Sequence, residues 1–194
     1  MQLDPEKLTA AIERLRRGEN TQAVARELDI SAAAVSALRR EIEKESRPSS
    51  ESLRPVVAEI AGEHGFTAQV KFSFSFPEVA LPKSYNPDCV WFDGAPEERS
   101  TVALFEIDDE VSPKHRAGSV AFANLVALRL SKRILFFAIA PPERERVATA
   151  TIEVHKRYLG DKWFLNSLVI ASFDPSVIRD RIRSALAGRR TSPP

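Results

Sequence analysis

The segment that most constrains the fold is an uninterrupted apolar run at residues 134–140. Lys132 and Arg133 precede the run, and Pro141 and Pro142 follow it. A short apolar run with such ends is typical of a central β-strand that is buried on both faces of a sheet. The run therefore predicts an α/β domain in which helices flank the sheet.

Helical and strand patterns alternate around this run. The run is preceded by an apolar helical stripe, an alternating strand and a hairpin of two strands. One more helix, which contains Asn124 among apolar residues, lies between the hairpin and the run. A polar residue in such a place usually has a structural hydrogen bond. The expected elements are a helix at 53–64, strands at 70–76, 88–92 and 102–108, a helix at 113–130, the apolar strand, a helix at 143–159, a strand at 168–173 and a helix at 175–186.

Three carboxylates stand at the ends of the two hairpin strands. Asp88 opens the first strand, and Glu106 and Asp108 end the second. Side chains alternate faces along a strand, so Glu106 and Asp108 share one face. If the strands pair antiparallel, all three acids can converge, and burying them is costly unless a cation neutralises them. Three oxygen ligands suit a hard divalent cation such as Mg²⁺ or Mn²⁺.

The pair Pro87-Asp88, followed by Glu106-Ile107-Asp108, resembles the acidic motifs of the PD-(D/E)xK nuclease superfamily. The expected order of helix, three strands, helix and strand is the αβββαβ core of its restriction-endonuclease-like fold, a mixed sheet flanked by helices. The resemblance implies a metal-dependent DNA endonuclease in which the three acids hold Mg²⁺ or Mn²⁺ and carry catalysis. Asp108 departs from the motif, because most members have a lysine there.

Because Asp108 stands in place of the motif lysine, the positive charge that this lysine would supply to catalysis has to come from another residue. Lys114, at the start of the helix at 113–130, is the first candidate for this catalytic role, and Lys71 is the second. Both are also compatible with ordinary surface lysines. The alternative for the whole domain is a nuclease fold without catalysis, which would serve as a DNA-binding or regulatory protein.

Residues 1–45 have the pattern of three short helices, with Gly18 ending the first and Ser31 capping the third. The spacing of apolar residues from Ala25 to Leu38 resembles the helix-turn-helix of resolvase-like and transcription-factor domains. The resemblance implies a small all-α DNA-binding domain before the α/β domain. A three-helix protein-interaction bundle is the alternative.

Five side chains of this first domain are candidate DNA contacts: Arg16, Arg17, Ser36, Arg39 and Arg40. The third helix is poor in the Arg, Asn and Gln side chains that read base edges near a helix start. We therefore expect contacts mainly to phosphates, with little discrimination of sequence.

The composition and the absence of certain sequence signals limit which classes of function the chain can have. The net charge of the 194 residues is +1, so affinity for DNA must come from local patches. No apolar run is long enough to span a membrane and no secretory signal is evident, which predicts a cytoplasmic protein without a membrane partner. Cys89 is the single cysteine. No glycine-rich phosphate loop is present, so we expect no nucleotide cofactor. A homodimer is compatible with the sequence, which leaves the oligomeric state open.

The expected domain organisation follows from these patterns. It consists of a helix-turn-helix domain at 1–45, a polar linker at 46–52, a nuclease-like domain at 53–188 and a disordered tail at 189–194.

Overall fold

The computed structural model describes residues 4–45, 48–77, 84–108 and 113–189, and it divides the chain into two compact units. Unit 1 spans Met1–Arg47 and unit 2 spans Pro48–Pro194. No helix in the described ranges has the length and apolar character needed to cross a membrane.

Unit 1 contains the three predicted helices, α1 (Pro5–Arg16), α2 (Thr21–Glu27) and α3 (Ala32–Glu45). Gly18 follows the C-cap of α1 and has a φ of +83°, a conformation that glycine adopts without steric cost. Ser31 Oγ accepts a hydrogen bond from the Ala34 amide at 3.2 Å and so caps α3. The helices enclose a small apolar core of Ala11, Leu15, Val24, Ala25, Ile30 and Val35.

Unit 2 is built on a mixed five-stranded sheet in the order β1-β4-β5-β6-β7. The pairs β1–β4 and β4–β5 are antiparallel, whereas β5–β6 and β6–β7 are parallel. The strands of this sheet are β1 (Thr67–Val70), β4 (Cys89–Phe92), β5 (Thr101–Ile107), β6 (Ile134–Ile139) and β7 (Leu165–Ile170). A separate antiparallel pair is formed by β2 (Phe74–Ser75) and β3 (Ser84–Tyr85).

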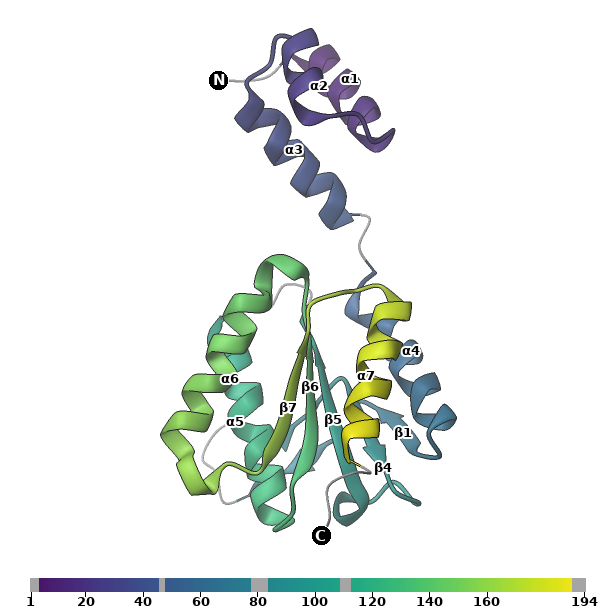
Figure 1. The fold of residues 1–194 in the computed structure, drawn as a ribbon, viewed down its shortest axis with the longest axis vertical. Coiled ribbons are helices and arrows are strands. Elements are labelled where there is room, and N and C mark those ends of the chain that lie inside the picture. The colour runs from purple at the N-terminus through teal and green to yellow at the C-terminus, as the bar shows by residue number, and fades with distance from the viewer. Residues whose placement is uncertain (1–3, 46–47, 78–83, 109–112, 190–194) are drawn as a thin grey trace. The chain divides into compact units, whose positions relative to one another are not determined.

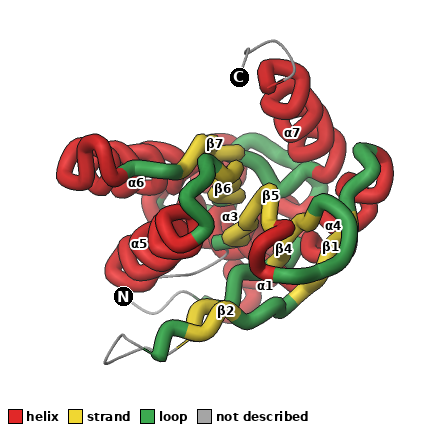
Figure 2. Tube along the Cα trace, turned by 90° about the horizontal axis from the view of Figure 1, so that it is seen from below, coloured by secondary structure: helices red, strands yellow, loops and turns green. Residues whose placement is uncertain are grey.

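Helices cover both faces of this sheet, as Figures 1 and 2 show. On one face lie α4 (Ser50–Glu63) and α7 (Pro175–Arg189), and on the other lie α5 (Pro113–Arg129) and α6 (Glu145–Leu159). All residues of β6 are buried between these layers. The prediction of an α/β domain with a doubly covered central strand is confirmed.

Asn124 of α5 is buried, and its hydrogen bonds join this helix to the segment before β7. Its Nδ2 donates to the Lys162 carbonyl at 2.9 Å, and its Oδ1 accepts from the Phe164 amide at 2.8 Å. The structural role predicted for this polar residue is confirmed.

Two predicted strands differ from the structure. The alternating run at 70–76 is not one strand, because Lys71 has a φ of +60° and separates β1 from β2. The last strand begins at Leu165, three residues before the predicted 168–173, with the exposed Asn166 inside it. A strand at the edge of a sheet tolerates such polar residues, which obscured its start in the sequence.

Several predicted boundaries also shift. The linker predicted at 46–52 is too long, since α4 begins at Ser50, capped by Ser49 Oγ, which accepts from the Ser52 amide at 3.3 Å. The helix predicted at 143–159 begins at Glu145, after a short 3-10 helix at Pro142–Arg144. The tail predicted at 189–194 loses its first residue to α7, and residues 190–194 lie outside the described part. Further 3-10 helices are Glu98–Ser100 and Gly160–Lys162.

Candidate functional site

The ends of β4 and β5 bring Asp88 and Glu106 together. Cys89 pairs with Phe105 in the antiparallel register, so the next residues outward, Asp88 and Glu106, lie opposite each other. The Asp88 amide donates to the Phe105 carbonyl at 2.9 Å, which keeps the chain close to β5 beyond the last paired residue. The antiparallel pairing on which the predicted acidic site depended is confirmed.

The Asp88 carboxylate is held from two sides. Its Oδ2 accepts a hydrogen bond from the Ile107 amide at 2.7 Å. Its Oδ1 accepts two bonds from Arg54 of α4, from Nε at 2.9 Å and from Nη2 at 2.5 Å. The side chains of Arg54 and Asp88 are only 18% and 14% exposed. Arg54 is therefore a site residue that the sequence analysis missed, because an arginine in the first turns of a helix usually lies in solvent.

The Glu106 carboxyl group is enclosed by hydrogen-bond donors. Its Oε1 accepts from the Tyr85 hydroxyl at 2.6 Å, and the Ser119 side chain of α5 also hydrogen-bonds to it. Burial raises the pKa of Glu106 to about 8, and the negative charge of Asp88 adds to this shift. The bonds from Tyr85 and Ser119 and the charge of Arg54 oppose the shift without cancelling it. Desolvation of the Glu106 carboxylate therefore outweighs the groups that stabilise its charge.

Tyr85 is the second residue that the sequence analysis missed. It is buried at the end of β3, and its ring packs between Phe74 and Phe122. Burial and the neighbouring Glu106 raise the pKa of Tyr85 well above its usual range. The phenol therefore keeps its proton and acts as a donor to Glu106.

Asp108 is buried and bound to the helix that follows it. Its amide donates to the Ile139 carbonyl at 2.8 Å, and its carboxylate forms an ion pair with Arg116 of α5. Burial lowers the pKa of the Arg116 guanidinium, and the charge of Arg144 lowers it further. This pair connects the carboxyl end of β5 to α5, a role that differs from the predicted one as a metal ligand.

Within the described ranges, no three His, Cys, Asp or Glu side chains are grouped so that they could hold a metal ion. Asp88, Glu106 and Asp108 are thus not assembled as one three-carboxylate set. Mg²⁺ does not need such a set, since it keeps several waters and is often bound by one or two carboxylates together with substrate phosphates. Asp88 and Glu106 fit that requirement in donor chemistry.

The predicted lysines have different outcomes. The backbone of Lys114 lies in the first turn of α5, and its side chain is outside the described part of the structure. Lys71 is exposed and follows β1, whose last residue, Val70, pairs with Cys89. The catalytic role of Lys114 stays a prediction.

Arg16, the last residue of α1, and Arg17, which follows it, lie close to acidic side chains of the same unit. Arg16 Nη2 is 3.5 Å from Glu45 Oε2, and Arg17 Nη2 is 3.5 Å from Glu19 Oε1. The side chains of Arg16, Arg17 and Glu45 are largely exposed, and that of Glu19 is less exposed. These are surface ion pairs, which contribute little to stability and can exchange partners in water.

The residues predicted on α3 are joined to one another and to α2. Arg39 Nη1 donates to Thr21 Oγ1 at 3.0 Å, and its Nε is 3.3 Å from Glu43 Oε1. Arg40 Nε donates to the Ser36 carbonyl at 3.3 Å. The charged surface of unit 1 therefore carries both signs, and the role of these residues in DNA contact stays a prediction.

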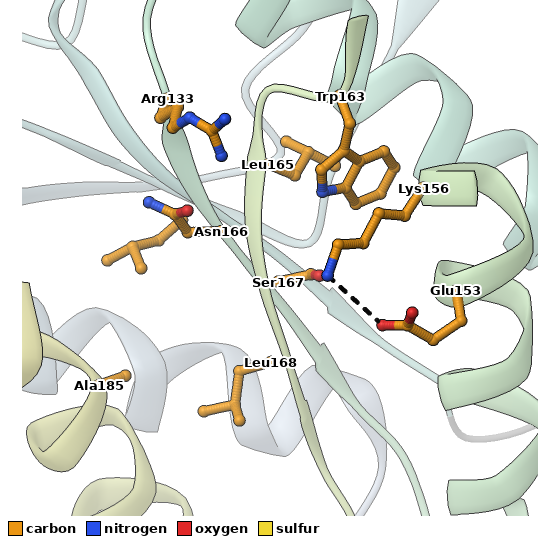
Figure 3. A pocket seen from close by; sticks show the side chains of 10 residues that line it. Arg133, Glu153, Lys156, Trp163, Leu165, Asn166, Ser167, Leu168 and Ala185 are labelled. Carbon is orange, nitrogen blue, oxygen red and sulfur yellow. Dashed lines mark ion pairs between the residues drawn. The ribbon is translucent and has the colours of Figure 1, made fainter. Parts of the chain in front are cut away.

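A groove of about 510 Å³ lies along β7, between α6 and α7, and Figure 3 shows the side chains that line it. Lys156 projects into it and is 3.9 Å from Glu153 of the same helix. None of its lining residues belongs to the acidic site. They are Arg133, Leu135, Glu153, Lys156, Trp163, Leu165, Asn166, Ser167, Leu168 and Ala185.

Comparison of the chain with protein-family models, with curated proteins and with solved structures finds no match.

Proposed function

We propose that unit 2 is a metal-dependent deoxyribonuclease of the PD-(D/E)xK type and that unit 1 is a helix-turn-helix domain that brings it to DNA. Along the chain, the strands of the main sheet and the helices that cover it follow the order α4, β1, β4, β5, α5 and β6. This order supports a restriction-endonuclease-like core. The position of Asp88 opposite Glu106 at the ends of β4 and β5 also supports it.

The observation that carries this proposal is the pairing of Asp88 with the half-buried Glu106. Two carboxylates on opposing strands repel each other when both are ionised, and burial adds to the cost. Burial, with a smaller contribution from the charge of Asp88, raises the pKa of Glu106 to about 8. A divalent cation at the two acids would favour the ionised form of both.

The residues around the acids fit this role. A bound Mg²⁺ would polarise a phosphate and lower the pKa of an attacking water. Asp88 is oriented by the Ile107 amide, and Glu106 is oriented by Tyr85 and Ser119. Such fixed partners limit the rearrangement needed when ligands bind.

The test is cleavage of supercoiled and linear DNA by the full chain in Mg²⁺ or Mn²⁺. Wild-type protein should nick or cut the DNA, whereas Asp88→Asn and Glu106→Gln should lose at least about a hundredfold in rate. Glu153→Gln, at an exposed glutamate of α6, is the matched control and should cut normally. Equal cutting by all variants, or none by the wild type in either metal, would contradict the proposal.

A second candidate function is DNA binding or regulation without catalysis. It is favoured by the arginines, since Arg54 and Arg116 already neutralise Asp88 and Asp108. In that case the full chain would bind duplex DNA equally well in EDTA and in Mg²⁺, without any cleavage.

A further inference from the structure

Arg54 is a cation placed directly on a carboxylate of the candidate metal site. Both of its bonds to Asp88, at 2.9 Å and 2.5 Å, end on the single oxygen Oδ1. Its Nη1 also lies 3.9 Å from Glu51, an exposed residue of the same helix. Because Arg54 and Asp88 are both largely shielded from water, this contact is stronger than a surface ion pair.

The other oxygen of Asp88 is also in use. Oδ2 accepts from the Ile107 amide at 2.7 Å, so the carboxylate has a donor on each oxygen. A guanidinium cannot lose its proton in a protein, and it therefore cannot make room by becoming neutral. A divalent cation next to Asp88 would meet a fixed positive charge within hydrogen-bond distance of the same atom.

We propose that Arg54 competes with divalent cations for Asp88, so that the guanidinium must leave Oδ1 before a metal ion binds there. Arg54 is then an internal counter-ion that keeps the acidic pair stable without metal and reduces its affinity for metal. This inference rests on the proposed function, because it concerns regulation of the same site.

The first test measures Mn²⁺ binding to the full chain by isothermal titration calorimetry. Arg54→Gln removes the competing charge and should bind Mn²⁺ at least about tenfold more tightly than the wild type, because breaking even one of the two charge-assisted hydrogen bonds costs about that much. Arg54→Lys keeps a positive charge and should fall between the two. Arg99→Gln is the matched control, because it removes the same charge from an exposed arginine and should leave affinity unchanged.

The outcomes separate the two proposals. Binding of Mn²⁺ by Arg54→Gln alone, or more tightly than by the wild type, supports the competition. Equal or weaker binding by Arg54→Gln refutes the competition while leaving the metal site intact. If neither protein binds Mn²⁺, or if Glu106→Gln binds as well as the wild type, the metal site itself is wrong and the competition with it.

A second measurement follows the same contact in the wild-type chain. The arginine Nε–H signals of the wild-type chain are followed by NMR while Mg²⁺ is added, and Arg54→Lys identifies the signal of Arg54. Mg²⁺ should shift this signal and speed its exchange with water, because the bond to Asp88 is broken. An unchanged signal at Mg²⁺ concentrations where calorimetry with Mg²⁺ shows binding overturns the inference.

Discussion

Ionisation of Glu106 should make unit 2 less stable as pH rises. The pKa of Glu106 is raised to about 8 by burial and by the charge of Asp88, whereas a glutamate in the unfolded chain titrates near 4.5. Between these two values the folded state binds more protons than the unfolded state. Stability contributed by protonated Glu106 is therefore present at acidic pH and is lost as pH rises toward 8.

The size of this effect follows from the width of the pH window. One unit of difference in pKa is about 1.4 kcal/mol, so the range from pH 5 to pH 8 gives at most about 4 kcal/mol. Because Glu106 as a whole residue is only half-buried, water reduces this value, and we expect about 2 kcal/mol. Glu106→Gln cannot ionise, and its stability should lack this component.

The chain offers a selective probe for the measurement. Both tryptophans, Trp91 and Trp163, are buried in unit 2, so urea unfolding followed by tryptophan fluorescence reports on this unit alone. Wild type and Glu106→Gln are compared at pH 5, 6, 7 and 8 in EDTA, with Glu153→Gln as control. The wild type should lose stability relative to Glu106→Gln across this range. A constant difference between the two proteins from pH 5 to pH 8 would refute the raised pKa of Glu106.

Three further predictions concern other contacts. Asp108→Ala leaves the Arg116 cation buried without its carboxylate and should destabilise unit 2 by about 3 kcal/mol in the same fluorescence assay; the double variant with Arg116→Leu should recover part of this loss. Asn124→Ala removes two buried hydrogen bonds and should cost about 2 kcal/mol, with a loss below 0.5 kcal/mol contradicting the structural role. If unit 1 binds DNA through phosphates, Arg16→Gln combined with Arg17→Gln should reduce the slope of log affinity against log salt by about two, whereas an unchanged slope would favour a protein-interaction bundle.

Local patterns in the sequence were sufficient for much of the fold. The apolar run around Phe136 predicted the central strand, because only burial on both faces accounts for an unbroken apolar segment. The polar Asn124 inside an apolar helix predicted a buried hydrogen bond, which the structure contains. Both features depend on the polarity of residues a few positions apart in the chain, and this polarity can be read from the sequence.

Two errors in the strands had a common cause. The phenylalanines at 70–76 alternate as in one strand, yet the positive φ of Lys71 interrupts it, and a lysine gives no local sign of this conformation. The start of β7 was not predicted because Asn166 is polar, and a polar residue is tolerated there since β7 is at the edge of the sheet. Edge position is a property of the assembled sheet.

The chain by itself determined which acids stand at the ends of the hairpin strands, whereas the register that places Asp88 opposite Glu106 comes from the paired strands of the structure. Only the tertiary structure decided which side chains neutralise those acids. Arg54 comes from 34 residues before Asp88, and Tyr85 lies 21 residues before Glu106. The energy of a charge depends on distance in space and on access to water, and both are set by how α4, α5 and β3 pack around the strand ends.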